Sequence, residues 1–372
     1  MIDMKFIVVA GARPNFMKVA PILDAFRRVG GSPEVKLVHT GQHYDEKMSE
    51  DFFRDLGIPA PDVHLGVGSG THAEQTARIM VAFEEVCRRE MPDWVIVVGD
   101  VNSTVACALT AKKLGIQVAH VEAGLRSGDM TMPEEINRRC TDSITDAFFT
   151  TDTLANDNLV AEGVPAEHIY FVGNTMIDTL MRHVEQARSE PLPAGLREHN
   201  FAVLTLHRPS NVDHRGALDS ILCAILEISE RITVVFPVHP RTFSRLEAFG
   251  FLRTLEKAPG IRLLEPLSYL PFLGLVARSR MVLTDSGGIQ EETTVLGIPC
   301  ITLRENTERP ITCEVGTNVL VGADPLAIRD AAFRALAARL GNPNLPEKWD
   351  GCAAERIVRV LTNQASLTTA LH

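Results

Sequence analysis

Three acidic side chains follow successive strands or open a helix in the first half of the chain. Asp100 follows the apolar, strand-like segment 94–98, and Glu122 follows the segment 118–121. Glu134 begins the next predicted helix. A single carboxylate at such a position often caps a helix or complements its dipole. Three in succession predict acid and base catalysis, because neighbouring carboxylates move each other's pKa values apart.

The loop after the first strand-like segment combines a glycine with cations. It runs Gly11-Ala12-Arg13-Pro14-Asn15 and opens a predicted helix that contains Lys18. Backbone N–H groups, a helix N-terminus and two cations at one strand end predict an anion site. A tight turn followed by a solvated lysine explains the same residues equally well.

The segment Gly66-Val67-Gly68-Ser69-Gly70-Thr71 imitates a dinucleotide fingerprint. The third glycine of the G-x-G-x-x-G pattern is replaced by Thr71, the preceding apolar segment is short, and no suitable acidic strand end follows. We therefore expect a loop here and no nicotinamide or other cofactor.

Two histidines follow successive strand-like segments in the second half of the chain. His207 follows 202–206 and His239 follows 233–238, each with an arginine nearby. A lone histidine at a strand end is usually structural. Two such histidines predict a site for a phosphate or a leaving group.

A further strand-like segment, 281–284, leads into Asp285-Ser286-Gly287-Gly288 and a predicted helix. The serine hydroxyl and the free N–H groups suit a pyrophosphate, and Glu292, one turn inside the helix, suits ribose hydroxyls. Arg309 adds a cation. Each of these features is also common in ordinary loops.

The elements that must position these residues alternate between strands and helices. Helical periodicity follows each of the apolar segments 6–10, 35–40, 94–98, 118–121, 147–150, 202–206, 233–238, 261–264, 281–284 and 300–302. A helix from Thr71 to about Glu90 starts with a capping-box pattern, Thr71-x-x-Glu74. The alternation predicts an α/β fold of two Rossmann-like domains, each with a parallel sheet. Pro191-Leu192-Pro193 predicts a boundary near residue 190, with domains over 1–190 and 191–362 that face a shared cleft.

Composition excludes several classes of protein. With 372 residues the chain suits two α/β domains, and its net charge of -10 argues against a nucleic-acid surface. No apolar run approaches the roughly 18 residues of a membrane span, and the N-terminus lacks an export signal. The seven cysteines are scattered without a C-x-x-C pair, which favours reduced thiols over disulfides or zinc. We therefore expect a cytoplasmic protein without a metal.

Together these residues resemble the non-hydrolysing UDP-N-acetylglucosamine 2-epimerases. The matching motifs are Gly11-Ala12-Arg13-Pro14, Gly41-Gln42-His43, Gly99-Asp100, His120 to Arg126, Pro133-Glu134-Glu135, His207-Arg208, Asp285 to Glu292 and Glu308-Arg309-Pro310. The resemblance extends over residues 5 to 362. It implies a glycosyltransferase-B-like architecture, a homodimer, a nucleotide held mainly by the second domain, and a last helix that returns to the first.

The resemblance also implies roles for individual residues. Asp100, Glu122 and Glu134 would be the catalytic carboxylates, and His207 would lie beside the departing diphosphate. The candidate substrate-binding residues are Arg13, Lys18, Arg138, His239, Ser286, Gly287, Gly288, Glu292 and Arg309.

The expected reaction interconverts UDP-GlcNAc and UDP-ManNAc, in support of surface polysaccharide synthesis. The hydrogen at C2 of the sugar has no carbonyl beside it in the ring, so it must be made acidic in another way. One route is oxidation by a bound nicotinamide, for which the chain has no fingerprint, and the other, which fits the residues, is loss of UDP from C1. One carboxylate would take the C2 proton to give 2-acetamidoglucal, and another would return a proton to the opposite face. The sequence leaves open which carboxylate is the base and which is the acid.

Other functions fit parts of the sequence. A hydrolysing 2-epimerase would release ManNAc and UDP, and a related enzyme would act on another UDP-2-acetamido sugar. A glycosyltransferase on the same fold, or a nucleotide-sugar-binding module, would not need three carboxylates in the first domain.

Overall fold

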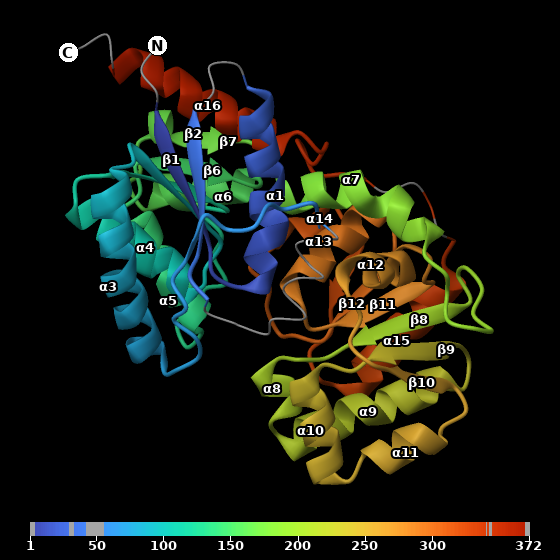
Figure 1. Ribbon diagram of the computed structural model, residues 1–372. Helices are drawn as coiled ribbons and strands as arrows, with labels where there is room; N and C mark the ends of the chain where they lie inside the picture. Colours follow the sequence, from blue (N-terminus) through green and yellow to red (C-terminus); the bar gives the residue numbers. More distant parts are fainter. Residues whose placement is uncertain (1–3, 30–32, 42–55, 340, 342–343, 369–372) are drawn as a thin grey trace. The chain divides into compact units, whose positions relative to one another are not determined.

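The computed structural model describes residues 4–29, 33–41, 56–339, 341 and 344–368 (Figure 1). Gln42 and His43 of the sequence motif lie outside the described residues. The chain divides into two compact units, Met1–Met181 with Glu347–His372 (unit 1) and Arg182–Pro346 (unit 2). This division falls inside one helix, α7 (Thr175–Ser189).

Unit 1 contains a seven-stranded parallel sheet in the order β3-β2-β1-β4-β5-β6-β7. Its strands are β1 (Lys5–Ala10), β2 (Glu34–His39), β3 (Val63–His64), β4 (Trp94–Val98), β5 (Gln117–Val121), β6 (Ala147–Thr150) and β7 (Ile169–Phe171). Its helices besides α7 are α1 (Arg13–Arg28), α3 (His72–Glu90), α4 (Asn102–Lys113), α5 (Pro133–Asp142), α6 (Thr153–Ala161), the 3-10 helix η1 (Ala166–His168) and α16 (Ala353–Thr368).

Unit 2 contains a six-stranded parallel sheet in the order β10-β9-β8-β11-β12-β13. Its strands are β8 (Phe201–Thr205), β9 (Thr233–Pro237), β10 (Ile261–Leu264), β11 (Met281–Thr284), β12 (Cys300–Thr302) and β13 (Asn318–Leu320). Its helices are α8 (Pro209–Val212), α9 (Arg215–Ser229), α10 (Pro240–Phe249), α11 (Leu252–Lys257), α12 (Tyr269–Ala277), α13 (Gly287–Leu296), α14 (Ile311–Glu314) and α15 (Pro325–Ala337). The prediction of two parallel-sheet α/β domains is therefore confirmed.

Helices cover both faces of the sheet in unit 2, and this explains its uninterrupted apolar strands. Ala202 and Leu204 of β8 pack into a core with residues of α9 and α15. Phe201 and Val203, which alternate with them, pack into a second core with residues of α12. Since successive side chains of a strand point to opposite faces, a sheet buried on both faces needs apolar residues at every position.

The predicted start of α3 is confirmed as a capping box. The Thr71 hydroxyl accepts a hydrogen bond from the backbone N–H of Glu74, 3.3 Å away. The Glu74 carboxylate accepts one from the backbone N–H of Thr71, at 3.1 Å. Each side chain thus satisfies an N–H group that the first helical turn leaves unpaired.

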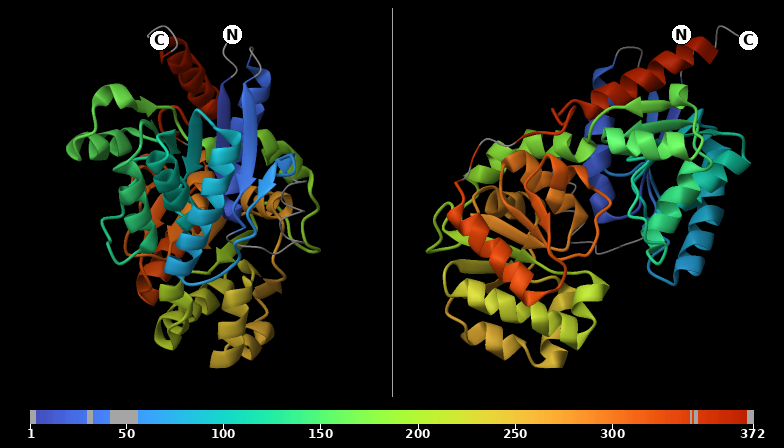
Figure 2. Two further views of the ribbon diagram at one scale, coloured as in Figure 1. Left: turned by 60° about the vertical axis from the view of Figure 1, so that its left-hand side comes forward. Right: turned by 180° about the vertical axis from the view of Figure 1, so that it is seen from behind.

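The last segment of the chain is joined to unit 1 by buried hydrogen bonds. The Trp349 indole donates to the carbonyl oxygen of Thr151, at 3.0 Å. The Asp178 carboxylate accepts the N–H groups of Ala353 and Ala354, at 3.1 and 2.7 Å, and so binds the N-terminus of α16. α16 packs against α1 (Figures 1 and 2). No described helix combines the length and the apolar character that crossing a bilayer requires.

Candidate active site

In each unit the candidate residues lie at the carboxyl edge of the sheet, beside and around the point at which the strand order reverses. This point lies between β1 and β4 in unit 1, and between β8 and β11 in unit 2. Ligands of open α/β sheets bind at such points. Each edge is therefore a candidate site.

The first loop of unit 1 is fixed by a buried asparagine. The Asn15 side-chain oxygen accepts the N–H groups of Gly11 and Ala12, at 3.0 and 2.9 Å. Its amide nitrogen donates to the carbonyl oxygen of Val98, at 3.2 Å. This side chain ties the start of α1 to the end of β4. Arg13 is the first residue of α1, and its side chain lies outside the described residues.

Lys18, predicted as an anion contact, forms a buried ion pair with Glu122. Glu122 has a left-handed backbone with a φ of 73°, which is strained for a residue other than glycine. Gly99 is also left-handed, and a Cβ on it would lie 3.0 Å from the Lys18 ammonium nitrogen and 3.2 Å from a Glu122 oxygen. Lys18 and Glu122 thus occupy the space beside Gly99, and the lysine charge is already balanced by a carboxylate.

Asp100 is held by Arg138, which was expected to contact substrate. The Arg138 guanidinium lies 2.6 Å from an Asp100 carboxylate oxygen and also pairs with Glu135. Asn137 donates to the backbone carbonyl of Asp100, at 2.9 Å. The Asp100 side chain is 27% exposed, whereas that of Arg138 is only 3% exposed. The Asp100 carboxylate is therefore partly accessible at the carboxyl edge of the sheet, and the buried Arg138 holds it in place.

The adjacent carboxylates Glu134 and Glu135 differ sharply in environment. Glu135 is fully buried and accepts hydrogen bonds from the N–H and hydroxyl groups of Ser127, at 2.9 and 3.0 Å. Burial raises the pKa of Glu135, but the Ser127 hydrogen bonds and the Arg138 guanidinium outweigh it and lower that pKa to about 2. Glu134 is half-buried and forms no hydrogen bond or ion pair with another described residue. Glu135 is structural, and Glu134 remains the candidate for proton transfer.

In unit 2, His207 is oriented by Asp285, a residue without a role of its own in the predicted site. Asp285 is completely buried, and its carboxylate lies 2.8 Å from Nδ1 of His207. It also accepts the N–H groups of His207 and Arg208, at 3.0 and 2.9 Å. Burial raises the pKa of Asp285, but these hydrogen bonds lower it below its usual range. Nδ1 of His207 therefore carries a hydrogen, and Nε2 remains for a ligand.

His239 lies beside His207, with ring centroids 6.0 Å apart. Its Nδ1 accepts the backbone N–H of Arg241, at 3.2 Å, and so caps α10. The structure thus brings together the two histidines that the sequence placed at successive strand ends.

Ser286, Gly287 and Gly288 form the N-terminus of α13. Ser286 is the N-cap residue, but its hydroxyl does not cap the helix. A Cβ on Gly287 would lie 2.7 Å from both a guanidinium nitrogen of Arg309 and a carboxylate oxygen of Glu308. Unpaired N–H groups at a helix N-terminus attract anions. Gly287 is required here because the Arg309–Glu308 pair approaches the backbone so closely.

Arg309, predicted as an anion contact for substrate, is almost completely buried between two carboxylates. It pairs with Glu308 and lies 2.7 Å from Glu291. Glu308 also contacts Arg304 at 2.8 Å and Arg208 at 3.8 Å. Burial raises the pKa of Glu308, but the surrounding guanidinium groups hold it well below its usual range. Arg309 thus belongs to a nearly balanced charge cluster beneath α13.

Glu292 is buried in the second turn of α13, next to Glu291. Burial and the neighbouring negative charge raise the pKa of Glu292 to about 8, despite an opposing interaction with the Tyr269 hydroxyl. One Glu292 oxygen has no hydrogen-bond partner among the described residues. A buried carboxyl group with unused capacity suits a ligand hydroxyl. Tyr269, which the sequence did not single out, lies on α12, far from the motif along the chain.

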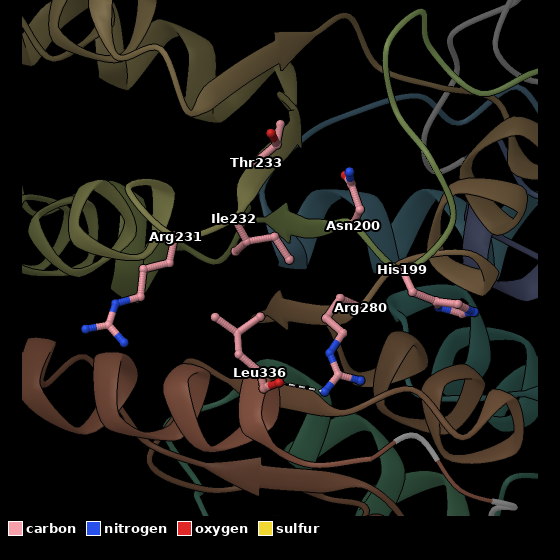
Figure 3. A pocket seen from close by; sticks show the side chains of 7 residues that line it. All are labelled: His199, Asn200, Arg231, Ile232, Thr233, Arg280 and Leu336. Atoms are coloured by element: carbon pink, nitrogen blue, oxygen red, sulfur yellow. Dashed lines mark hydrogen bonds between the residues drawn. The ribbon is translucent and has the colours of Figure 1, made fainter.

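An open pocket of about 420 Å³ lies at the opposite, amino edge of the unit 2 sheet (Figure 3). Its lining includes His199, Arg231 and Arg280. Arg280 donates to the carbonyl oxygen of Leu336, at 2.8 Å, and so caps the end of α15, while Arg231 lies over the Phe333 ring. Both cations thus have structural roles, and this edge is not where such folds bind ligands.

Comparison with known proteins identifies the family. Residues 28–362 match the family model described as UDP-N-acetylglucosamine 2-epimerase. A UDP-N-acetylglucosamine 2-epimerase of Methanocaldococcus jannaschii is 42% identical over 96% of this chain and 99% of its own length. A UDP-2,3-diacetamido-2,3-dideoxy-D-glucuronate 2-epimerase of Pseudomonas aeruginosa is 44% identical over 86% of this chain and 89% of its own length.

Comparison with solved structures identifies the same family. The Methanocaldococcus jannaschii UDP-GlcNAc 2-epimerase in complex with UDP-GlcNAc and UDP has a TM-score of 0.88, at 42% identity, over 97% of this chain and 100% of that one. A lipopolysaccharide outer core galactosyltransferase has a TM-score of 0.56 at 14% identity, a likeness of fold alone. It agrees with a glycosyltransferase-B-like fold. The chain therefore belongs to the UDP-N-acetylglucosamine 2-epimerase family.

Proposed function

We propose that this protein is a non-hydrolysing UDP-N-acetylglucosamine 2-epimerase that interconverts UDP-GlcNAc and UDP-ManNAc. The observation that carries the proposal is the set of Asp100, Glu122 and Glu134 at the carboxyl edge of unit 1, in a chain of this family. Two proton transfers at opposite faces of C2 require two different carboxyl groups. Unit 1 would supply them, and unit 2 would hold the nucleotide.

The arrangement in unit 2 supports binding of a uridine diphosphate. The N-terminus of α13 offers N–H groups and the Ser286 hydroxyl to the phosphates. His207, fixed through Nδ1 by Asp285, would present Nε2 to the diphosphate as it leaves C1. The buried carboxyl group of Glu292 would accept the ribose hydroxyls.

The reaction would proceed by elimination and addition. A carboxylate takes the C2 proton while the bond between C1 and the diphosphate oxygen breaks, which gives 2-acetamidoglucal and UDP. A second carboxyl group then delivers a proton to the opposite face of C2, and the diphosphate oxygen bonds to C1 again. The two half-reactions balance without an oxidant or a reductant.

Product analysis tests this function against its nearest alternatives. Incubation with UDP-GlcNAc is expected to give UDP-ManNAc at equilibrium, separated by anion-exchange chromatography. Accumulation of free ManNAc and UDP would instead assign the hydrolysing reaction. The 44% identity to the diacetamidoglucuronate 2-epimerase favours a second substrate class, so that UDP-sugar is tested in parallel. If the protein converts only the diacetamidoglucuronate UDP-sugar, the same mechanism applies to that sugar instead of UDP-GlcNAc.

The proposal also covers the oligomeric state, the cellular location and the use of the product. The family resemblance supports a homodimer, which light scattering coupled to size-exclusion chromatography tests. The cysteines of the described chain are all free, which supports a reducing cytoplasmic location. An epimerase of this kind would supply ManNAc-type sugars for surface polysaccharide. Cell fractionation tests the location, and loss of the polysaccharide in a deletion strain tests the role.

Adding a methyl group at Gly287 is expected to weaken UDP binding at least tenfold. The new Cβ in G287A would meet the Arg309–Glu308 pair at 2.7 Å, so either that pair or the start of α13 must move. Calorimetric titration with UDP measures the effect. Gly216 offers a matched control, because a Cβ there meets nothing within 4 Å and G216A should bind UDP normally. Equal affinities of the two variants would contradict a diphosphate site at this helix.

Glu292 is expected to make stability fall with rising pH. Its pKa in the folded protein is about 8, whereas an unfolded chain releases this proton near pH 4.5, so the folded state alone retains it between these values. Each unit of pH in this window should therefore remove about 1 kcal/mol of stability relative to E292Q. Thermal unfolding of both proteins from pH 5 to 8 measures the difference, in which shifts of other groups cancel. A constant difference would contradict the protonated carboxyl group.

The same residue is expected to contribute to nucleotide affinity. E292A removes the proposed acceptor of the ribose hydroxyls and should weaken UDP binding by about 1 to 3 kcal/mol. Titration calorimetry at pH 7 measures this change. Unchanged affinity would remove Glu292 from the nucleotide site.

A further inference from the structure

A buried histidine beneath the carboxylates of unit 1 has no role in the chemistry derived so far. His120 lies on β5, two residues before Glu122, and its side chain is completely inaccessible. Its Nδ1 lies 2.6 Å from a carboxylate oxygen of Asp142, the last residue of α5. Its Nε2 lies 2.8 Å from the backbone carbonyl oxygen of Gly99. Both ring nitrogens thus face oxygen atoms.

The hydrogen-bond chemistry decides which groups hold protons. A carbonyl oxygen only accepts, so Nε2 of His120 must donate to Gly99. The Asp142 carboxylate also accepts the N–H of Gly124 at 3.1 Å and lies 2.8 Å from the Arg126 guanidinium. Burial raises the pKa of Asp142, but His120 and Arg126 outweigh it and lower that pKa, so the ionised carboxylate is favoured. His120 thus links the Gly99 carbonyl to the buried Asp142 carboxylate through its two ring nitrogens.

The hydrogen-bonded pair of His120 and Asp142 touches both turns that carry strand-end carboxylates. Through Gly99 it holds the left-handed residue before Asp100. Through Gly124 it holds the turn that begins with the left-handed Glu122. The Gly124 turn has little freedom of its own, because a Cβ on Gly124 would lie 2.4 Å from a backbone oxygen of Ala155. One pair of side chains therefore fixes two adjacent, conformationally demanding turns.

We propose that His120 and Asp142 form a positioning pair that sets the distance between the carboxylates of Asp100 and Glu122. The inference rests on the proposed function, which assigns proton transfer to those two carboxylates. Neither His120 nor Asp142 touches substrate. They act by keeping the two turns in register, and a displacement of about 1 Å at such a site reduces turnover about 10²-fold.

Kinetic comparison of H120A with a destabilised control tests this role. H120A should lower kcat about 10²-fold and leave the affinity for UDP within twofold, because the nucleotide would bind to unit 2. The matched control is F83L, since Phe83 is fully buried in the apolar core of the same unit. F83L should lower the Tm and keep kcat within threefold. Loss of kcat in H120A no greater than in F83L, at an equal loss of Tm, would overturn the inference.

Asp142 supplies a second, independent comparison. D142A removes the contacts with His120, Gly124 and Arg126 and should reduce kcat as much as H120A. D142N keeps an oxygen for Gly124 and an amide that can hydrogen-bond to His120, so its kcat should exceed that of D142A at least tenfold. Equal kcat values for D142N and D142A would count against positioning. If H120A does not fold, H120Q, which keeps one donor, is compared with F83L in the same way.

Wild-type turnover is measured first and separates the two proposals. A wild-type protein that epimerises neither UDP-GlcNAc nor the diacetamido sugar would refute the proposed function. Wild-type turnover combined with an H120A variant that behaves like F83L would refute only the positioning pair.

Discussion

Replacing Glu134 by glutamine is expected to lower kcat for epimerisation by about 10²-fold or more, the usual scale for losing a proton-transfer group. D100N and E122Q should have effects of the same size. Each amide keeps the shape of the side chain and removes its capacity to exchange a proton. The affinity for UDP should stay within twofold, because these residues lie in unit 1 and the proposed nucleotide site lies in unit 2. Steady-state kinetics and titration calorimetry measure the two quantities.

The control for this series is E84Q. Glu84 lies on α3 of the same unit, where its side chain is 45% exposed and pairs with Arg88 one turn away. Its kcat should remain within twofold of the wild type, because exposed pairs of this kind contribute little. A variant of Asp100, Glu122 or Glu134 that turned over like E84Q would lose its place in the mechanism.

The second large effect is expected at His207. H207A should lower kcat by about 10² to 10³-fold, the range for removing one donor that stabilises a developing charge. D285A should come close to this loss, because Asp285 holds His207 through Nδ1. If Asp285 acts through the histidine, the double variant should be little worse than H207A alone, since residues that act as one unit are not additive.

The exposed neighbour His214 provides the control for this pair. It precedes α9 and its side chain does not cap that helix. H214A should therefore turn over normally. Losses of H207A and D285A that add fully in the double variant would show that Asp285 does not work through His207.

The strands were the most predictable part of the fold. The segments 94–98, 261–264, 281–284 and 300–302 match observed strands residue for residue. Their continuous apolar runs follow from burial on both faces of a parallel sheet. β13 was not predicted, because this edge strand has only three residues, of which Asn318 is polar and Val319 is 47% exposed. Short edge strands of this kind lack an apolar run.

The sequence predicted that the site residues follow the ends of strands. It did not predict which of their charged side chains form ion pairs with one another. The sequence separates Lys18 from Glu122 by 104 residues, so nothing local indicated that they form a pair. Glu134 and Glu135 are adjacent and look equivalent in a first helical turn. Only the tertiary structure distinguishes them, because Glu135 is buried against Ser127. The spacing of Glu135 and Arg138, three residues apart, was the one local signal for its structural role.

In unit 2, the roles of Asp285 and Arg309 follow from contacts with residues that are distant in the sequence. Asp285 sits at a strand end, where an aspartate is commonly structural, and its partner His207 lies 78 residues earlier. Arg309 was predicted as an anion contact, and nothing local indicated its pairing with Glu291, which lies 18 residues earlier in α13. Ion pairs between residues that are far apart in the sequence could therefore not be predicted before the fold was known.

Proton NMR of the reaction in deuterated water tests the central claim most directly. Elimination removes the C2 hydrogen and returns one from a carboxyl group that has exchanged with solvent, so UDP-ManNAc formed from UDP-GlcNAc should carry deuterium at C2. Longer incubation should also introduce deuterium at C2 of the remaining UDP-GlcNAc. UDP-ManNAc that retained the original hydrogen at C2, or a UDP-GlcNAc pool left unchanged by folded protein, would contradict the account.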